Sequence, residues 1–506
     1  MSDKYVLAID QGTTGSTVLI VRTNPDQSSQ IVSKATVDFE QHYPKPSWVE
    51  HDLHQIWSSV EAAANKAVDL AKTDKAFTKD KIVAIGITNQ RETLCVFDAV
   101  SSQPDCNAIV WQCKRSTDIC ETLKKNGFEK TIKEKTGLVL DPYFSGTKIT
   151  WLMENKPEIR ERLESGKAIL GTIDTFLIHK LTGGKVHATE ASNASRTLLY
   201  NIHKGEWDLE LLDILKVTNH ACLPCVKDSS GDFGSTLNLS FLPDGIPITG
   251  VLGDQQAALA GQTCFSVGEA KCTYGTGAFL LLNTGEIAET SANGLLTTIA
   301  WQLDGKVTYA LEGSSFIAGA AIQFLRDQLQ ILENSCDSES LSKNEAAAPH
   351  LYFVPTLSGL GAPYWEPNVQ GALLGLTRGT TKGQIIRAAI EGISFQVYDL
   401  VKAMAADSSE DLKILRVDGG ACANDLLMQI QSNYLNVEVE RPRDVETTAL
   451  GAAMFAALGV GIFRSLDELK GARKIEKVFV PSTVSTDTHL KGWKRAIEAV
   501  RVFAQK

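Results

Sequence analysis

Buried strands and amphipathic helices alternate along the hydrophobic pattern of this chain. In the segment 5–10 the side chains alternate between two faces, which is typical of a strand. The segment 52–70 repeats apolar residues at helical spacing. Its apolar face consists of Leu53, Ile56, Trp57, Val60 and Ala64. Two further strands are expected at 81–88 and 248–253. This alternation predicts an α/β fold.

Shorter helical patterns and one long apolar stretch complete the outline. Helices are expected at 148–154 and 158–164, on either side of Pro157, and a strand end at 170–171 leads into a helix over 172–181. The charge-free stretch 449–463 is shorter than the roughly 18 residues that a membrane helix needs. Its Gly and Ala content predicts a tightly packed buried helix.

A Gly- and Thr-rich loop interrupts the first apolar pattern. The loop 11–16 contains Gly12, Thr13, Thr14, Gly15 and Ser16, and it follows the carboxylate of Asp10. Glycines that bring the backbone close to a ligand, together with hydroxyl donors, form an anion cradle. A neighbouring carboxylate suits a hydrated Mg²⁺ ion. An ordinary β-hairpin turn is the alternative interpretation of the same residues.

A second loop of the same kind lies in the other half. The segment 269–283 predicts a strand, a turn formed by Gly275, Thr276 and Gly277, and another strand. Gly275 follows Gly12 by about half of the chain length. Two equivalent loops that face each other can hold both ends of a polyphosphate, so the repeat favours nucleotide binding over two unrelated hairpins.

The length of 506 residues predicts two large domains, because a single core seldom grows so large. We place the boundary at about Gly253, which gives domains 1–253 and 254–506. No Pro- or Ser-rich linker marks this boundary, so a hinge between closely packed halves is expected.

The bulk composition excludes some partners. The chain is 43% hydrophobic with a net charge of −10 and no basic run, which argues against a nucleic-acid partner. Its ten cysteines form no disulfide framework, and Cys222 and Cys225 are interpreted as incidental thiols. Asp3 and Lys4 lead directly into the first strand without a signal peptide, so a cytoplasmic location is expected.

Polar residues that follow predicted strands are candidates for the reaction site. Arg91 and Glu92 offer donors and an acceptor together, as a neutral polyol requires, or they form a solvated surface pair. Asp254 can act as a general base with an orienting amide at Gln255, or it can cap a helix. Trp111 and Tyr143 either wall a small pocket or fill a core.

Two glycine positions in the second half admit a ligand. A strand at 415–420 ends in two glycines before a helix near Asn424, where an adenine ring can lie on bare backbone, although a plain tight turn has the same sequence. After a strand at 308–313, Ser314 or Ser315 is expected to cap a helix that contains Gly319. Close approach of a ligand or a neighbouring backbone, or core packing, would explain that glycine. Together these features predict a two-domain ATP-dependent phosphotransferase.

Several longer motifs identify a known family. They are DQGTT (10–14), GITNQRET (86–93), DPYFSGTK (141–148), NASRT (193–197), GDQQAAL (253–259), TYGTG (273–277), YALEG (309–313) and RVDGGACAN (416–424). Essentially end to end, the chain resembles the glycerol kinases of the FGGY carbohydrate kinase family. That resemblance implies two ribonuclease H-like, actin-like ATPase domains flanking an active-site cleft.

The resemblance also implies a reaction and a set of site residues. ATP and glycerol would give sn-glycerol 3-phosphate and ADP, with Mg²⁺ present and Asp254 as the general base. The residues that would bind the glycerol hydroxyls are Arg91, Glu92, Tyr143, Asp254 and Gln255, with Trp111 and Phe279 against the carbon side. The nucleotide would be held by Thr13, Thr14, Gly15 and Thr276 at the phosphates and by Gly319, Gln323, Gly420 and Asn424 at the adenosine.

The remaining expectations concern the metal, the partners and the alternatives. Asp10 and Asp254 would face the Mg²⁺ ion. The expected partners are glycerol and ATP, with no nucleic acid and no membrane insertion, and the expected assembly is a homodimer or homotetramer. A kinase for another polyol or sugar is the nearest alternative, and an actin-like ATPase without a small acceptor is a more distant one.

Three positions depart from the pattern of the family. Thr17 stands where many members have an Arg that reaches the phosphates. Gly245 stands where some bacterial members have an Arg for fructose 1,6-bisphosphate, and the segment 228–235 has no His that could be phosphorylated. We therefore expect another residue to supply the missing charge near the phosphates, and neither form of regulation is expected.

Overall fold

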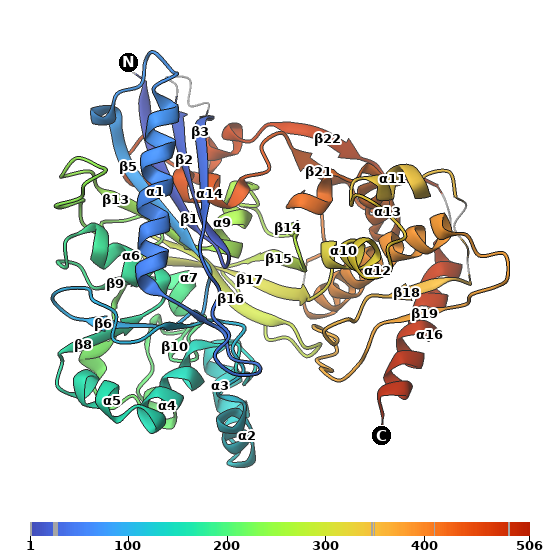
Figure 1. Cartoon of the computed structure of the whole chain (residues 1–506), viewed down its shortest axis with the longest axis horizontal. Helices are drawn as coiled ribbons and strands as arrows, with labels where there is room; N and C mark the ends of the chain where they lie inside the picture. The colour runs from blue at the N-terminus through green and yellow to red at the C-terminus, as the bar shows by residue number, and fades with distance from the viewer. Residues whose placement is uncertain are drawn as a thin grey trace.

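The computed structural model contains two large β-sheets with helices on their faces (Figure 1). It describes residues 3–23, 29–345, 348, 350–408, 410–483 and 486–505. Among these residues, no helix has both the length and the apolar character needed to cross a bilayer.

The first sheet has five strands in the order β13-β5-β1-β2-β3. The strands are β1 (Lys4–Gln11), β2 (Gly15–Thr23), β3 (Ser29–Asp38), β5 (Ile82–Asn89) and β13 (Ile248–Gly253). The first three run antiparallel, whereas β5 and β13 continue the sheet in parallel. The predicted strands 5–10, 81–88 and 248–253 are confirmed.

The second sheet repeats this arrangement and extends it. Its order is β16-β17-β15-β14-β20-β21-β22. The strands are β14 (Glu269–Tyr274), β15 (Ala278–Gly285), β16 (Leu296–Leu303), β17 (Lys306–Ser315), β20 (Ile414–Asp418), β21 (Val439–Pro442) and β22 (Ile475–Phe479). The row β17-β15-β14-β20-β21 has the same directions as β3-β2-β1-β5-β13. The duplication inferred from the two Gly-Thr loops therefore extends over two whole five-stranded units.

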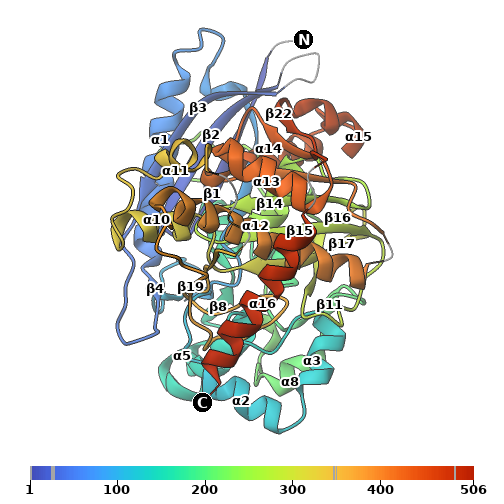
Figure 2. The ribbon, with the colours of Figure 1, turned by 90° about the vertical axis from the view of Figure 1, so that its right-hand side faces the viewer.

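Helices form three layers that alternate with the two sheets. On the first sheet, α1 (Leu53–Ala71) packs against β2 and β3, and the Asp52 carboxylate accepts from His54 N at 2.8 Å at its start. On the second sheet, α12 (Lys382–Asp407) packs against β15 and β17, with α13 (Asp425–Leu435) beside it. Figure 2 shows these two helices in front of the second sheet, with α10 (Gly319–Asp327) and α16 (Asp487–Ala504) nearby.

The middle layer consists of two helices that join the sheets. The helix α14 (Thr447–Gly459) packs on β1, β5 and β13 of the first sheet, although it comes from the second half. The helix α9 (Asp254–Gly261) follows β13 and packs against α14, and it also contacts β14 and β15. The predicted buried helix at 449–463 is thus confirmed, with its end at Gly459.

The contact between α9 and α14 is made by backbone. A Cβ atom built on Gly451 would lie 1.9 Å from Ala257 O, and one built on Gly261 would lie 1.9 Å from Thr447 O. Any side chain at either position would push the helices apart, so the glycines allow a separation that larger residues would prevent. Through this contact α14, which packs on the first sheet, is held against α9, which contacts the second sheet.

The remaining helices lie outside the two large sheets. A lower lobe contains α2 (Thr117–Lys125), α3 (Glu129–Thr136), α4 (Ser145–Asn155) and α5 (Pro157–Glu164) (Figure 1). The strand β8 (Ala168–Gly171) leads into α6 (Ile173–Leu181), and α11 (Asp337–Ser342) contacts α12 and α13. The expected helices at 148–154, 158–164 and 172–181 are confirmed.

One helix start was predicted wrongly. The strand β17 continues through Ser314 and Ser315, whose backbones pair with β15, so neither serine caps a helix. The following helix, α10, begins only at Gly319. Gly319 is therefore the first residue of that helix and does not lie in its interior.

The α9–α14 contact gives a stability prediction. Gly451→Ala should lower the free energy of unfolding by about 1–3 kcal/mol, because the new methyl group would overlap backbone atoms of α9. Without that contact, Ala is favoured over Gly inside a helix by about 1 kcal/mol, so the sign itself is diagnostic. Urea denaturation measures the difference.

Gly471→Ala is the matched control, since a Cβ atom there would meet no other atom within 4 Å. An unchanged or increased stability of Gly451→Ala would contradict the close helix contact.

Candidate active site

The two predicted Gly-Thr loops occupy equivalent positions in the two sheets. The first joins β1 to β2 and is closed by a hydrogen bond from Gly12 N to Gly15 O of 2.9 Å. The second joins β14 to β15 and is closed by one from Gly275 N to Gly277 O, also of 2.9 Å. Thr14 and Thr276 are exposed at the two tips. Both predicted hairpins are confirmed, with their hydroxyl-bearing tips accessible.

The second loop carries the start of α10. Ala318 N donates to Thr276 O at 2.7 Å, and Gly319 N donates to Gly275 O at 2.9 Å. A Cβ atom at Gly319 would lie only 2.7 Å from Gly275 O. Close approach of a neighbouring backbone therefore accounts for this glycine.

The predicted adenosine residues lie on two elements that meet beside this loop. A Cβ atom at Gly319 would lie 3.8 Å from the Cβ of Ala421, which follows Gly420 in the β20–α13 connection. Gly420 itself borders open space. Asn424 caps α13 by accepting from Leu427 N at 2.9 Å. The turn thus leaves bare backbone beside α10, which also carries the exposed Gln323.

Arg91 and Glu92 are buried, so the solvated surface pair is excluded. Their side chains are 2% and 1% exposed. Glu92 has a positive φ of 61°, which is uncommon for a residue with a side chain and occurs where the surrounding structure imposes it. The Arg91 guanidinium makes two hydrogen bonds to Glu312, from Nη1 at 2.6 Å and from Nη2 at 2.9 Å. Its Nε lies 3.1 Å from Asp254 Oδ1.

A second arginine extends these contacts into a buried network. Arg196 donates from Nε to Glu92 Oε1 at 2.7 Å and from Nη2 to Glu312 Oε1 at 3.0 Å. We call Arg91, Glu92, Arg196 and Glu312 the Arg–Glu network. Its charges balance, as buried ions require. Glu312 lies on β17 of the second half, whereas the other three belong to the first, so the network links the halves.

The two carboxylates of the network differ in their acidity. Burial raises the pKa of Glu312, but Arg196 and Arg91 outweigh burial and lower it to about 2. Burial also raises the pKa of Glu92, and there the same arginines do not compensate fully. The reason is the number of bonds: Glu312 accepts three guanidinium hydrogen bonds, whereas Glu92 accepts one.

An aromatic pair connects the first loop to the residues predicted to bind the polyol. Trp111 Nε1 donates to Thr13 Oγ1 at 3.0 Å, and the Trp111 and Tyr143 rings meet edge to face at 5.4 Å. Both rings are partly exposed, which favours the wall of a pocket over a core filling.

A buried lysine supports the Tyr143 turn from behind. Lys148 Nζ donates to Pro142 O at 2.5 Å and to Tyr143 O at 2.7 Å. Ser145 Oγ donates to Glu92 O at 2.8 Å. These bonds fix the turn against the loop that carries Arg91 and Glu92.

Asp254 is the first residue of α9, the helix that follows β13 and contacts β14. Gly253 occupies the cap position, so Asp254 is not the helix N-cap. Its Oδ1 accepts from Gln255 N at 2.7 Å, and the side chain is 29% exposed. Burial raises the pKa of Asp10 to about 8, with further contributions from the carboxylates of Asp254 and Glu446. Two carboxylates that repel each other in this way attract a cation.

The donor set fits Mg²⁺ better than a metal held by side chains alone. Among the described residues, no cluster of three or more His, Cys, Asp or Glu side chains is arranged to hold a metal ion. Mg²⁺ requires only one or two carboxylates, because waters and phosphate oxygens complete its shell. Asp10 and Asp254 supply such a pair.

Thr17 faces the same side of the first sheet as Asp10. The two residues are opposite each other in the β1–β2 pair, and Thr17 Oγ1 lies 2.9 Å from Thr36 Oγ1 on β3. The position that many family members fill with Arg therefore holds a neutral hydroxyl beside Asp10.

Three charged residues of the site were missed by the sequence prediction. They are Arg196, Glu312 and Lys271, and all three are fully buried or nearly so. Lys271 Nζ contacts Gln255 Oε1 and donates to Thr273 Oγ1 at 2.9 Å. Glu312 and Lys271 could have been recognised in the sequence, because each is a single charge within an apolar strand, in YALEG and AKCTY. Of the predicted residues, the side chains of Phe279 and Gln323 make no hydrogen bond or ring contact with the others in the described part of the chain.

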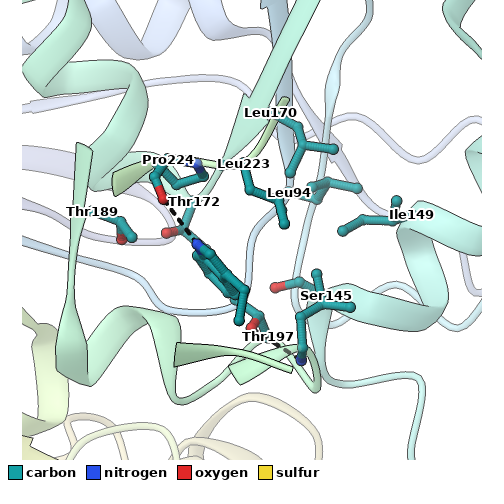
Figure 3. A pocket seen from close by; sticks show the side chains of 12 residues that line it. Leu94, Ser145, Ile149, Leu170, Thr172, Thr189, Thr197, Leu223 and Pro224 are labelled. Carbon is teal, nitrogen blue, oxygen red and sulfur yellow. Dashed lines mark hydrogen bonds between the residues drawn. The ribbon is translucent and has the colours of Figure 1, made fainter. Parts of the chain in front are cut away.

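A separate apolar pocket lies in the lower lobe (Figure 3). Its lining includes Leu94, Ser145, Ile149 and Leu170, and it has no charged lining residue. Trp207 Nε1 closes part of it by donating to Pro224 O at 2.9 Å. Since none of the predicted site residues lines it, this pocket is not the reaction site.

Comparison with known proteins finds similarity along both halves of the chain. The models of the FGGY family of carbohydrate kinases match residues 5–261 with the N-terminal domain and 270–460 with the C-terminal domain. Proteins named glycerol kinase are similar over their full length. That of Desulforamulus reducens is 53% identical over 98% of both chains, and that of Listeria innocua is 50% identical over 99% of this chain and 100% of its own.

Solved structures agree with this similarity. The glycerol kinase of Plasmodium falciparum with ADP has a TM-score of 0.91 and 36% identity, covering 99% of this chain and 98% of that one. A gluconate kinase from Lactobacillus acidophilus shares the fold, with a TM-score of 0.88 at 23% identity and coverage of 100% and 99%. The duplicated sheets, the paired loops and the matches over both halves lead to one conclusion: the chain belongs to the FGGY family of carbohydrate kinases.

Proposed function

We propose that this chain is an ATP-dependent glycerol kinase, which transfers the terminal phosphoryl group of ATP to glycerol and yields sn-glycerol 3-phosphate and ADP. The observation that carries the proposal is the ion pair of 3.1 Å between Arg91 and Asp254, which joins a predicted polyol-binding residue to the proposed base. Full-length relatives at 53% and 50% identity, both named glycerol kinase, support it.

The acceptor side offers the polarity that a small polyol requires. In the described part of the chain, Arg196 bonds Glu92 through Oε1, which leaves Oε2 to accept from an acceptor hydroxyl. Gln255 and Asp254 present a donor and an acceptor next to each other. The Trp111 and Tyr143 rings, with Phe279 on β15, would pack against the carbon atoms of glycerol.

Asp254 is proposed to take the proton of the terminal hydroxyl as that oxygen attacks the phosphorus in line. Phosphoryl transfer depends on positioning and charge neutralisation more than on covalent chemistry of the protein. The ion pair with Arg91 orients the Asp254 carboxylate. Mg²⁺, held by Asp10 and Asp254, would supply charge neutralisation at the phosphate oxygens.

The nucleotide is proposed to lie along the second half. Thr13, Thr14 and Gly15 of the first loop and Thr276 of the second would bind the phosphates through hydroxyl and backbone donors. Gly319 and Gln323 on α10, with Gly420 and Asn424 of the β20–α13 connection, would border the adenosine. A solved relative that contains ADP supports nucleotide binding by this fold.

A cytoplasmic site of action is part of the proposal. All ten cysteines are free, as expected of thiols in a reducing compartment. The expected homodimer or homotetramer stays a prediction, as do the domain boundary at Gly253 and the two missing regulatory features.

The proposed acceptor is tested by a panel. ADP release is measured with glycerol, dihydroxyacetone, xylulose and gluconate, and glycerol should lead in kcat/KM by about tenfold or more, because it alone in the panel combines three carbons with three hydroxyls. Another leading acceptor would make the chain a kinase for a different polyol or sugar. ATP hydrolysis that does not respond to any acceptor would favour the actin-like ATPase.

Asp254→Asn tests the base. The amide keeps an oxygen for Arg91 and Gln255 N but cannot accept the proton, so kcat with glycerol should fall by about 10²–10⁴, while the KM for ATP changes by about twofold or less. Steady-state kinetics measures both. Asp467→Asn, at a site 84% exposed, is the control. Turnover close to the wild-type value would remove Asp254 as the base.

Glu312→Gln tests the Arg–Glu network. The change leaves two buried guanidinium groups with one carboxylate, so the free energy of unfolding should fall by about 3–5 kcal/mol and kcat/KM for glycerol should fall with it. Chemical denaturation and kinetics measure the two effects, with the exposed Glu286→Gln as control.

The pH dependence of that difference checks its origin. The pKa of Glu312 is lowered from 4.5 to about 2 in the folded protein, so its contribution is complete above about pH 4.5 and is lost as the pH falls towards 2. The stability gap between wild type and Glu312→Gln should therefore narrow below pH 4.5. A gap that stays constant down to pH 3 would show that lost packing causes it.

A further inference from the structure

Lys271 is a buried cation that the proposed reaction does not use. Its side chain is fully buried on β14, two residues before Thr273. Its hydrogen bonds go to two neutral oxygens, Gln255 Oε1 and Thr273 Oγ1. Among the described residues, no carboxylate forms an ion pair with it. Burial lowers its pKa, although the Asp418 carboxylate opposes this effect. A charge kept in such a place at a free-energy cost calls for a role.

The ammonium group determines how Gln255 is turned. Lysine has donors only, so the atom of the Gln255 amide that faces Lys271 must be the oxygen. The amide nitrogen, Nε2, then points away from Lys271. In the described part of the chain, Nε2 has no acceptor. Gln255 therefore offers a free donor on the side opposite to β14.

This free hydrogen-bond donor is adjacent to a hydrogen-bond acceptor, the carboxylate of Asp254. The two residues are consecutive in the first turn of α9, and the Asp254 carboxylate accepts from the backbone N–H of Gln255 at 2.7 Å. A hydroxyl group both donates and accepts, so a donor and an acceptor placed side by side match it. With the amide turned the other way, two acceptors would face the hydroxyl, and one lone pair would meet no donor.

We propose that Lys271 is a positioning residue that sets the hydrogen-bond polarity of Gln255 and thereby selects an acceptor with a hydroxyl oxygen beside the reacting group. The proposal rests on the proposed function, because it assigns Gln255 to the acceptor site. Lys271 itself does not touch the acceptor. Its effect should appear in the binding of the acceptor and not in the binding of the nucleotide.

The experiment compares three variants of the full chain by steady-state kinetics. Lys271→Met removes the donor and the charge, and the KM for glycerol should rise about tenfold while kcat and the KM for ATP change by about threefold or less. Lys271→Gln keeps an N–H donor without the charge and should recover most of the affinity for glycerol. Lys306→Met, on the exposed start of β17, is the control.

A double-mutant cycle tests the route through Gln255. Gln255→Leu combined with Lys271→Met should raise the KM for glycerol no more than Gln255→Leu alone, because both changes remove the same hydrogen bond. If the KM for glycerol of the double variant rose by the product of the two single-variant increases, the proposal would be overturned. Equal losses of kcat in Lys271→Met and Lys271→Gln, with the KM for glycerol unchanged, would also overturn it, since the charge would then act on the transferred phosphoryl group.

Folding and the choice of acceptor are controlled separately. Thermal unfolding of every variant shows whether it is folded, and if Lys271→Met is not, the cycle is run with Lys271→Leu, which also removes the donor, and Gln255→Leu. If the wild type prefers another acceptor in the panel, the proposed function fails. The cycle is then measured with that acceptor, and non-additive KM effects would still support the role of Lys271.

Discussion

The two hydrogen bonds between the Arg91 guanidinium and the Glu312 carboxylate join a loop of the first half to a strand of the second. Both side chains are buried, so neither charge can be solvated by water if the contact breaks. Arg196 completes the charge balance by bonding Glu92 and Glu312. The orientation of the acceptor residues, and of Asp254 through Arg91, therefore depends on the two halves being held in register.

The relative position of the two sheets is set by the packing of two helices. The helices α9 and α14 meet through Gly261 and Gly451 at a distance that leaves no room for a side chain. Because α9 begins with Asp254 and Gln255, the same contact that joins the two sheets also places the proposed base. Each of the duplicated five-stranded units carries one Gly-Thr loop. The helix packing that holds the fold together therefore also positions residues of the proposed site.

Local features were predictable where the local signal was strong. The hairpins at Gly12 and Gly275, the helix after Asp52 and the strand before Gly419 all follow from periodicity and turn residues. The start of α10 was not predicted correctly. Ser314 and Ser315 are typical capping residues, but pairing with β15 keeps them in a strand. Tertiary hydrogen bonds overrode the capping preference.

Short-range patterns and motifs were enough to predict the α/β class, the duplication and the candidate polar residues at strand ends. Which charges are buried together followed from the folded arrangement alone. Arg91, Arg196 and Glu312 are far apart in the chain, and no spacing rule relates them. It also decided that Lys271 faces Gln255, because that contact depends on how α9 lies on the second sheet. Burial changes the energy of a charge more than any local pattern does, and burial is a property of the folded chain.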